Sequence, residues 1–354
     1  MTGYKIIGVM SGTSLDGLDI ALCDFRKNEH SWNYKIIKAK TFKYTDSWKK
    51  KLEGACTLNS HDFIMLHNEY GDFIGNKIKT FLSGHSIMPD LISSHGHTIF
   101  HEPNNGLTFQ IGNGANITAA TGITTISDFR SLDIALKGQG APLVPAGDDL
   151  LFGDYDYCLN LGGFCNISYR KNKKRIAFDI CPVNIILNRL SGAYNMEYDK
   201  DGKLGRDGCV NKKLLKELDD ISFYKQDPPK SISREWLEQV FVPVLKKHKI
   251  SDKDKISTIY EHISYQIAKI PAGNSKTTLF VTGGGVYNKY LMDLLGQISN
   301  CSIIIPDKII IEYKEAMIFA FLGMLRIRNE INCLSSATGA KFDNIGGTIF
   351  RINR

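Results

Sequence analysis

The sequence contains one pattern twice: an apolar strand runs into glycines and returns as a second apolar strand. The first copy joins residues 6–10 to residues 18–23 through a tip made of Ser, Gly, Thr, Ser, Asp and Gly. The second lies about 150 residues later, where 157–161 leads through Gly162 and Gly163 into 164–169. Both patterns predict β-hairpins. Because this spacing is typical of duplicated domains, we expect two similar lobes that close on one nucleotide.

The first tip offers the groups that bind phosphate. Its glycines let the backbone approach closely, its hydroxyls add donors, and its exposed N–H groups can point at an anion. Asp16 and Asp19 would repel a bare phosphate, so they indicate a bridging Mg²⁺ with its water shell. An ordinary Gly/Ser turn is the alternative, and the second hairpin weakens it.

A carboxylate ends the strand that follows the second hairpin. Asp179 closes the apolar run 176–179, and Pro182 followed by the apolar sequence 184–190 predicts that a helix begins just after it. The N-terminus of that helix would keep the carboxylate ionised, as a general base requires. A helix cap is the alternative, and this segment alone does not decide between the two.

Two polar segments of the first half follow strands. For His95, His97 and His101, contacts to a polar ligand are favoured over a metal site, because no Cys or fourth ligand stands at zinc-like spacing. Arg130 lies in a Gly-rich loop after the strand at 123–127, where ligands of open α/β sheets bind. A local ion pair between Arg130 and Asp133 is the alternative.

The last part of the chain combines a strand, three glycines and a helix. Gly283, Gly284 and Gly285 would let a flat ring or a phosphate lie against the backbone. The glycine spacing and the missing later acidic residue disfavour a dinucleotide fold, and with it a dehydrogenase. Glu315 is expected in the first turn of a helix at 314–329, where it either favours the helix dipole or faces the ligand as a second carboxylate.

Composition sets the limits of this interpretation. A chain of 354 residues fits two domains of ordinary size. The net charge of +7 is spread along the chain, and its densest basic run, 170–175, has no interleaved aromatic residue, which argues against nucleic acid. The eight cysteines form no C-x-x-C pair and no apolar run could span a bilayer, so we expect a cytoplasmic protein with reduced cysteines. The segment 199–208 resembles a calcium loop but has Lys212 in place of the required acidic residue.

Taken together, five motifs resemble those of the anhydro-N-acetylmuramic acid kinase family, which belongs to the actin, hexokinase and Hsp70 class. The motifs are 8–17, 95–98 with 101–103, 128–130, 138–145 and 283–285. The resemblance runs nearly end to end. It implies an α/β fold of two duplicated actin/hexokinase-like (ribonuclease H-like) lobes, each a mixed β-sheet with helices, flanking a nucleotide cleft. We expect an N-terminal lobe at 1–127 plus about 335–354 and a C-terminal lobe at 128–334.

The resemblance also implies a reaction. Such a kinase opens the 1,6-anhydro bond of its sugar with water while it phosphorylates O6 from MgATP, giving N-acetylmuramic acid 6-phosphate in cell-wall recycling. Asp179 would deprotonate the attacking water, and Glu315 would orient metal or water. Arg130 and the segment 95–97 would hold the lactyl carboxylate and the hydroxyls of the sugar.

The predicted site therefore has three groups of residues. The nucleotide contacts are Ser11, Gly12, Thr13, Ser14, Leu15, Asp16, Gly17, Leu18, Asp19, Asn160, Gly162, Gly163, Gly283, Gly284, Gly285 and Asn288, with Asp16 reaching Mg²⁺ through water. The sugar contacts are His95, Gly96, His97, Arg130, Gln139 and Asn184, and the catalytic residues are Asp179 and Glu315. The expected partners are ATP and the anhydro sugar, without nucleic acid or membrane, and a homodimer is left open.

The chain departs from the family pattern at three places. Where the family usually has Asp-Thr-Gly-Pro-Gly-Asn, this chain has Asp-Ile-Cys-Pro-Val-Asn at 179–184. His97 stands where glutamine is common, and Phe164-Cys165 replaces a smaller pair. The base itself is retained. A degenerate nucleotide-binding relative with weak or no kinase activity is therefore the alternative.

Overall fold

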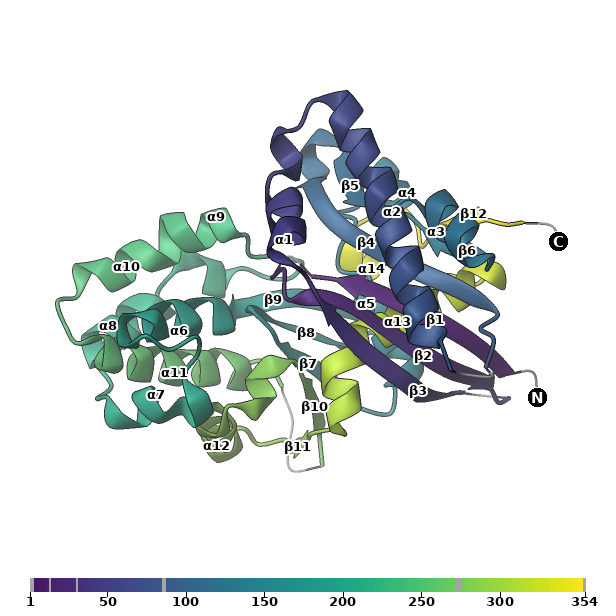
Figure 1. Ribbon diagram of the computed structural model, residues 1–354. Helices are drawn as coiled ribbons and strands as arrows, with labels where there is room; N and C mark the ends of the chain where they lie inside the picture. The colour runs from purple at the N-terminus through teal and green to yellow at the C-terminus, as the bar shows by residue number, and fades with distance from the viewer. Residues whose placement is uncertain (1–2, 13, 30, 85–86, 272–275, 353–354) are drawn as a thin grey trace. The chain divides into compact units, whose positions relative to one another are not determined.

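The computed structural model describes residues 3–12, 14–29, 31–84, 87–271 and 276–352. The chain divides into two compact units, which are considered separately. Unit 1 comprises Met1–Leu151 with Tyr313–Arg354, and unit 2 comprises Phe152–Glu312. Each unit has its own sheet with helices packed against it (Figure 1).

In the described part of unit 1, the sheet has seven strands in the order β12-β6-β4-β1-β2-β3, and β5 pairs with β4. β1 is antiparallel to β2 and parallel to β4. The predicted first hairpin is therefore confirmed, and β3 pairs with β2 to extend it into a meander. The strands are β1 (Gly3–Ser11), β2 (Gly17–Lys27), β3 (Trp32–Lys43), β4 (Leu91–Glu102), β5 (Leu107–Ile111), β6 (Thr125–Ser127) and β12 (Thr348–Phe350).

Helices cover both faces of this sheet. Alternate residues of β1 and β2 meet the apolar side chains of α2 in one buried cluster that includes Ile7, Val9 and Ile74. On the other face a Cβ at Gly8 would lie 1.8 Å from the carbonyl oxygen of Ala316 in α13, so only glycine lets that helix come so close. The helices of this unit are α1 (Asp46–Glu53), α2 (Ser60–Leu82), α3 (Gly114–Thr121), α4 (Ser131–Ala135), α5 (Val144–Leu151), α13 (Lys308–Ile327) and α14 (Ser335–Thr338).

In the described part of unit 2, the sheet has five strands in the order β11-β10-β7-β8-β9. The strands are β7 (Tyr157–Leu161), β8 (Phe164–Lys171), β9 (Lys174–Pro182), β10 (Thr278–Thr282) and β11 (Ser302–Ile304). The helices are α6 (Asn184–Ser191), α7 (Lys203–Asp207), α8 (Lys212–Asp219), α9 (Arg234–Trp236), α10 (Val242–Lys247), α11 (Asp252–Ala268) and α12 (Lys289–Ile298). A π-helical turn at Leu237–Phe241 joins α9 to α10, so residues 234–247 form one continuous helical segment.

Five strands of each unit pair in the same way. In unit 1, β6, β4 and β1 are mutually parallel neighbours, and β1, β2 and β3 follow as an antiparallel meander. In unit 2, β11, β10 and β7 are parallel neighbours, and β7, β8 and β9 form the meander. The two hairpins therefore occupy the same position in each sheet, as the internal repeat in the sequence predicts.

The boundaries of the units differ from those of the predicted lobes. Residues 128–151 and 313–334 were expected in the second lobe, whereas they belong to unit 1. The packing of Gly8 on Ala316 is one physical reason. Another is a buried ion pair, 2.8 Å long, between Lys314 of α13 and Asp148 of α5.

Candidate functional site

The tip of the first hairpin connects β1 to β2. Ser14 and Asp16 are exposed on it, and Leu15 has a left-handed backbone (φ 60°), a conformation that few side chains adopt and that often marks functional loops. Thr13, predicted as a nucleotide contact, lies outside the described residues. Within the tip, the Leu15 N–H donates to the Gly12 carbonyl at 3.3 Å. The tip thus presents polar groups on a tight turn, as phosphate binding requires.

Three other residues near this tip that were predicted to contact the nucleotide also stabilise the fold. Leu18 is completely buried in the core. A Cβ at Gly17 would lie 2.7 Å from the Phe42 carbonyl oxygen of β3, so the meander itself requires glycine there. The Asp19 carboxylate accepts a hydrogen bond from the Thr41 hydroxyl at 2.6 Å.

The tip of the second hairpin is bound to the helix that follows β9. The Gly163 carbonyl accepts hydrogen bonds from the N–H groups of Val183 (2.9 Å) and Ile185 (3.2 Å), and the Gly162 carbonyl accepts from Asn184 N–H at 3.3 Å. The Asn184 side-chain amide donates to the Leu161 carbonyl at 3.1 Å. The N–H groups at the start of α6 are therefore paired with the hairpin rather than free for an anion.

The glycines after β10 press against the end of β7. A Cβ at Gly283 would lie 2.5 Å from Asn160 Oδ1, and a Cβ at Gly285 would lie 2.7 Å from Leu161 Cβ. Gly284 differs, because its nearest neighbour would be 3.9 Å away. Two of the three glycines are thus required by packing within unit 2, and Gly284 is the one that leaves open space.

Asn288, predicted as a nucleotide contact, caps α12. Its side-chain oxygen accepts from Leu291 N–H at 3.1 Å, and its amide nitrogen donates to the Tyr260 hydroxyl at 2.6 Å. These bonds use both polar atoms of the amide, so the side chain is committed to the fold.

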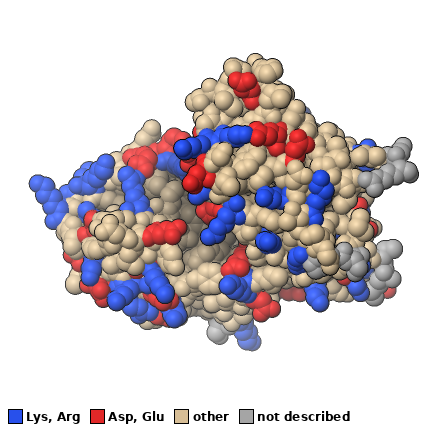
Figure 2. All heavy atoms as spheres, in the orientation of Figure 1, with Lys and Arg blue, Asp and Glu red and all other residues tan. Residues whose placement is uncertain are grey.

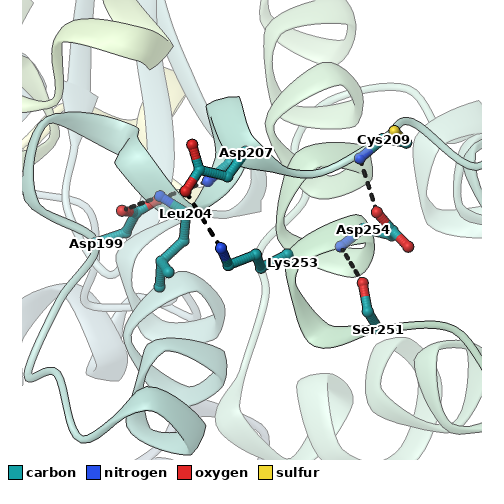
Figure 3. A network of polar contacts seen from close by, with 8 residues as sticks. Asp199, Leu204, Asp207, Cys209, Ser251, Lys253 and Asp254 are labelled. Atoms are coloured by element: carbon teal, nitrogen blue, oxygen red, sulfur yellow. Dashed lines mark hydrogen bonds and ion pairs between the residues drawn. The ribbon is translucent and has the colours of Figure 1, made fainter.

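The segment that resembles a calcium loop has the same kind of duty (Figure 3). Buried Asp199 accepts hydrogen bonds from Leu204 N–H (2.8 Å) and Gly205 N–H (3.1 Å), which fixes the start of α7. Nearby, Lys253 pairs with Asp207 at 3.2 Å. Among the residues that the structure describes, no group of three His, Cys, Asp or Glu side chains is arranged to hold a metal ion.

Asp179 lies on β9 at an irregularity of the meander. Cys165 pairs with Cys181 whereas the next residue, Asn166, pairs with Asp179, so Ile180 is an extra residue on β9. Such a bulge re-aims the side chains beside it. The carboxylate accepts a hydrogen bond from Ile232 N–H at 2.8 Å. The base candidate is thus held by a backbone donor from another part of unit 2.

The ionisation of Asp179 depends on burial rather than on the helix N-terminus that the sequence suggested. Burial raises the pKa of its carboxyl to about 6, and the hydrogen bond from Ile232 opposes this only partly. The helix N-terminus does not dominate, because its N–H groups bond to Gly162 and Gly163. Pro182 ends β9 rather than entering the first turn of α6. A pKa near 6 nevertheless suits a general base, since it leaves the carboxylate ionised yet basic at neutral pH.

His95 and His97 do not share a face of β4. Val9 pairs with Ser94 and Ser11 pairs with His97, so β4 contains one extra residue there, and Gly96 has φ 74°. His95 therefore packs on Phe319 of α13, with ring centroids 4.6 Å apart. His97 turns to the other face, where its Nδ1 lies 2.8 Å from Ser11 Oγ. The expectation that residues two apart share a strand face fails because of this bulge.

Arg130 is bonded to His95 rather than to Asp133. Its Nε–H donates to His95 Nε2 at 3.0 Å, and another N–H donates to the Gly140 carbonyl. Asp133 accepts instead from Gly140 N–H at 2.8 Å and from the Thr338 hydroxyl at 2.8 Å. Burial lowers the pKa of Arg130 to about 10, so the guanidinium stays charged at neutral pH.

Glu315 lies well inside α13, which begins at Lys308. The prediction of a first-turn position was wrong, so a helix-dipole role is excluded. Glu315 is exposed, although the surrounding protein raises the pKa of its carboxyl, a shift that Lys314 and Arg130 oppose. The Gln139 side chain is also exposed, while its N–H donates to the Thr338 carbonyl at 2.8 Å.

A cavity of about 200 Å³ opens beside His95 within unit 1. It is bounded by β5, the start of α3, the segment 127–131 and β12. Its lining includes His67, His95, Gln110, Asn113 and Asp128. Burial lowers the pKa of His67, so this lining carries a neutral imidazole at neutral pH.

Sequence reasoning missed two contributors to the site. One is the Ile232 N–H that holds Asp179, because a backbone donor has no residue signature. Tyr44 lies 2.7 Å from Ser11 through its hydroxyl. Its position one residue after β3 gave no signal for this contact.

The surface charge and the apolar character of the described helices bear on which partners the protein could bind. On the face shown in Figure 2, basic and acidic side chains are interspersed, so the excess of positive charge is not gathered there. None of the described helices combines the length and the apolar character that a bilayer crossing needs.

Comparisons with known proteins agree along the whole chain. Residues 4–352 match the family described as anhydro-N-acetylmuramic acid kinase. A relative of that name from Francisella tularensis subsp. novicida (strain U112) is 34% identical and the match covers 99% of both chains; one from Clostridioides difficile (strain 630) is 34% identical, with 97% of both covered. Among solved structures, a ROK family glucokinase from Streptomyces griseus in complex with glucose and AMPPNP matches 90% of this chain and 98% of that chain, at 11% identity and a TM-score of 0.41.

Proposed function

Because the chain belongs to the anhydro-N-acetylmuramic acid kinase family, we propose that it phosphorylates 1,6-anhydro-N-acetylmuramic acid from ATP while water opens the anhydro bond. The product is N-acetylmuramic acid 6-phosphate, formed in the recycling of cell-wall sugar. Family membership confirms the resemblance drawn from the motifs, and the two matching sheets agree with the α/β fold of the actin and hexokinase type. Nothing in the comparisons favours the degenerate alternative or a dehydrogenase.

The observation that carries the mechanism is the environment of Asp179. Its carboxylate is half-buried, has a pKa raised to about 6 and is fixed by Ile232 N–H. It takes a proton from water as the water oxygen bonds to the anomeric carbon. The bond from that carbon to O6 breaks, and its electron pair forms the new bond from O6 to the γ-phosphorus as ADP leaves. One carboxylate thus accepts the single proton that the coupled reaction releases.

The first hairpin tip would hold the triphosphate. Its glycine and hydroxyl groups, with the left-handed turn at Leu15, suit close approach of phosphate oxygens. Exposed Asp16 offers the hard oxygen donors that Mg²⁺ prefers, and it would hold the ion through water. When bound, Mg²⁺ neutralises charge on the β- and γ-phosphates. Gly284, in the turn after β10, would take the adenosine end.

Unit 1 would hold the sugar. Arg130 is a half-buried cation oriented by His95 and Gly140, and its remaining N–H groups suit the lactyl carboxylate. The adjoining cavity would take part of the sugar, with His97 and Gln139 on neighbouring segments. Glu315 would orient water or Mg²⁺, since its electrostatic coupling to Arg130 indicates that the two lie near each other. We further propose a cytoplasmic location, and a homodimer remains to be tested by its mass in solution.

The test uses the purified full chain with MgATP and anhydro-N-acetylmuramic acid. Mass spectrometry should detect N-acetylmuramic acid 6-phosphate and ADP in equal amounts. Asp179→Asn should form both at least about a hundredfold more slowly. Asp220→Asn, which changes an exposed carboxylate of the same unit, should match the parent. If the parent binds ATP yet forms no sugar phosphate, the proposed function is wrong.

A further inference from the structure

Three hydroxyl groups and one imidazole form a continuous buried chain in unit 1. Tyr70 Oη lies 2.5 Å from Tyr44 Oη, which lies 2.7 Å from Ser11 Oγ, which lies 2.8 Å from His97 Nδ1. Each of the four residues is 6% exposed or less. The chain joins α2, the segment after β3, the last residue of β1 and β4. The chain of hydrogen bonds thus links Ser11, which immediately precedes the phosphate tip, to the histidine segment.

The bulge at Gly96 makes this chain of hydrogen bonds possible. Without the extra residue in β4, His97 would lie on the α13 face with His95. With it, His97 lies on the α2 face, in edge contact with the Tyr70 ring at a centroid distance of 6.3 Å. A Cβ at residue 96 would lie 2.4 Å from the Ile111 carbonyl oxygen, so glycine fixes the bulge. His97 is therefore placed beside Ser11 by the backbone.

The direction of donation along the chain can be deduced. If each hydroxyl donates toward His97, every hydroxyl proton has an acceptor and Nδ1 accepts the last one. In the reverse direction Nδ1–H donates outward and the Tyr70 proton returns to Ser11, whose hydroxyl oxygen then accepts two hydrogen bonds. The direction without a doubly accepting hydroxyl runs from Tyr70 through Tyr44 and Ser11 to His97.

This direction fixes the state of His97. Because Nδ1 accepts, the neutral ring carries its proton on Nε2. Burial lowers the pKa of His97 to about 4 and raises the pKa of Tyr44, so no member of the chain ionises at neutral pH. Nε2 forms no hydrogen bond with another described residue. A neutral, oriented N–H donor remains, which suits a hydroxyl or carbonyl oxygen rather than a phosphate.

We propose that Tyr44 and Tyr70, acting through Ser11, are positioning residues that hold His97 as an Nε2–H donor to an uncharged oxygen of the sugar. The proposal rests on the proposed function for the identity of the sugar. Unit 1 would then contact the sugar through two different donors. The charged Arg130 binds the carboxylate, and the neutral His97 binds a hydroxyl or the acetamido carbonyl. The same chain ties Ser11, and hence the base of the phosphate tip, to the sugar segment.

The first test observes the tautomer directly. Long-range ¹H–¹⁵N correlation spectra of histidine-labelled protein distinguish Nε2–H from Nδ1–H rings, and His97→Gln assigns the signal. The parent should show His97 as Nε2–H at pH 7 without any ligand. An Nδ1–H ring or a mixture of tautomers would overturn the proposal. This readout does not need activity, so it stands even if the anhydro sugar is not the substrate.

The second test uses kinetics of matched tyrosine variants. Tyr44→Phe keeps the ring packed but removes the proton that orients Ser11, so KM for the sugar should rise about threefold to tenfold, the effect of one neutral hydrogen bond. KM for ATP should stay within about twofold, and His97 should become a mixture of tautomers. Tyr70→Phe should have a smaller effect of the same kind, because Tyr44 can still donate.

Tyr4→Phe, at the far end of β1 where the hydroxyl accepts from Arg328, is the control and should change neither value. His97→Gln keeps one donor and one acceptor and should retain more sugar affinity than His97→Phe. If Tyr44→Phe leaves the tautomer and KM for the sugar unchanged, the proposal is wrong. It is equally wrong if kcat and both KM values change together with a loss of thermal stability, because that would be a structural effect.

Discussion

The two hairpins occupy the same position in their sheets but use their tips differently. In the first, the side chain of Ser11 is held by His97 and Tyr44, and the residues beyond it form an exposed turn. In the second, the carbonyls of Gly162 and Gly163 accept the N–H groups that begin α6. The strands are duplicated, but the two tips therefore form different contacts. The first tip is suited to bind phosphate, whereas the second fixes the turn between β9 and α6.

The largest expected effect concerns Asp179. Asp179→Asn keeps an oxygen that can accept from Ile232 N–H but removes the base, so kcat should fall by about 10²–10⁴. In the parent, kcat should decline below a pH of about 6 as Asp179 becomes protonated. Steady-state kinetics from pH 5 to 8 measure both. A variant that retains more than a tenth of the parent activity would remove Asp179 from the mechanism.

The same substitution should stabilise the fold. The pKa of Asp179 is raised from 3.8 to about 6, so the folded state binds the proton more tightly than the unfolded state does. The free energy of unfolding therefore falls as pH rises from about 4 to about 6, and the loss at pH 7.5 should be about 1–3 kcal/mol. Asp179→Asn lacks this loss. Urea unfolding at pH 7.5 should show the variant to be more stable, and a less stable variant would contradict the burial argument.

Substitutions of two glycines after β10 distinguish the effect of packing from the effect of ligand binding in unit 2. Gly283→Ala forces a Cβ onto Asn160 Oδ1 at a positive φ of 87° and should lower the free energy of unfolding by about 2–4 kcal/mol. Gly284→Ala meets only open space and should leave stability unchanged within about 0.5 kcal/mol. If adenosine lies against Gly284, this variant should instead raise KM for ATP. Equal losses of stability in both variants would show that the contact distances do not control tolerance.

A smaller effect compares the two tips directly. An alanine Cβ fits at Gly12, where Ser14 Oγ is nearest at 3.4 Å, and at Gly163, where Ile185 Cβ is nearest at 3.8 Å. Because the first tip is assigned to the phosphates, Gly12→Ala should raise KM for ATP by about tenfold, the loss of about 1.4 kcal/mol. Gly163→Ala should change it by less than about twofold. The reverse order of effects would exchange the roles given to the two tips.

The sequence predicted the fold better than the contacts around the candidate base. The repeated hairpins, the meander and most helices follow from local apolar patterns. The Gly96 bulge places His95 and His97 on opposite faces of β4. A single glycine in a strand sequence does not predict such a bulge. The apolar run 309–311 at the start of α13 has no helical period of its own, so Glu315 was assigned to the wrong turn. The pKa of Asp179 depends on packing and on a donor 53 residues away, which no local pattern contains.

The central claim is that Asp179 directs water to the sugar rather than to ATP. It is tested most directly by running the reaction in H₂¹⁸O and locating the label by mass spectrometry of the sugar phosphate and its fragments. The account predicts one ¹⁸O on the anomeric carbon and none in the phosphoryl group, with unlabelled product incubated in H₂¹⁸O as the control for exchange. Label in inorganic phosphate or in the phosphoryl group, or no label above the exchange control on the anomeric carbon, would contradict it.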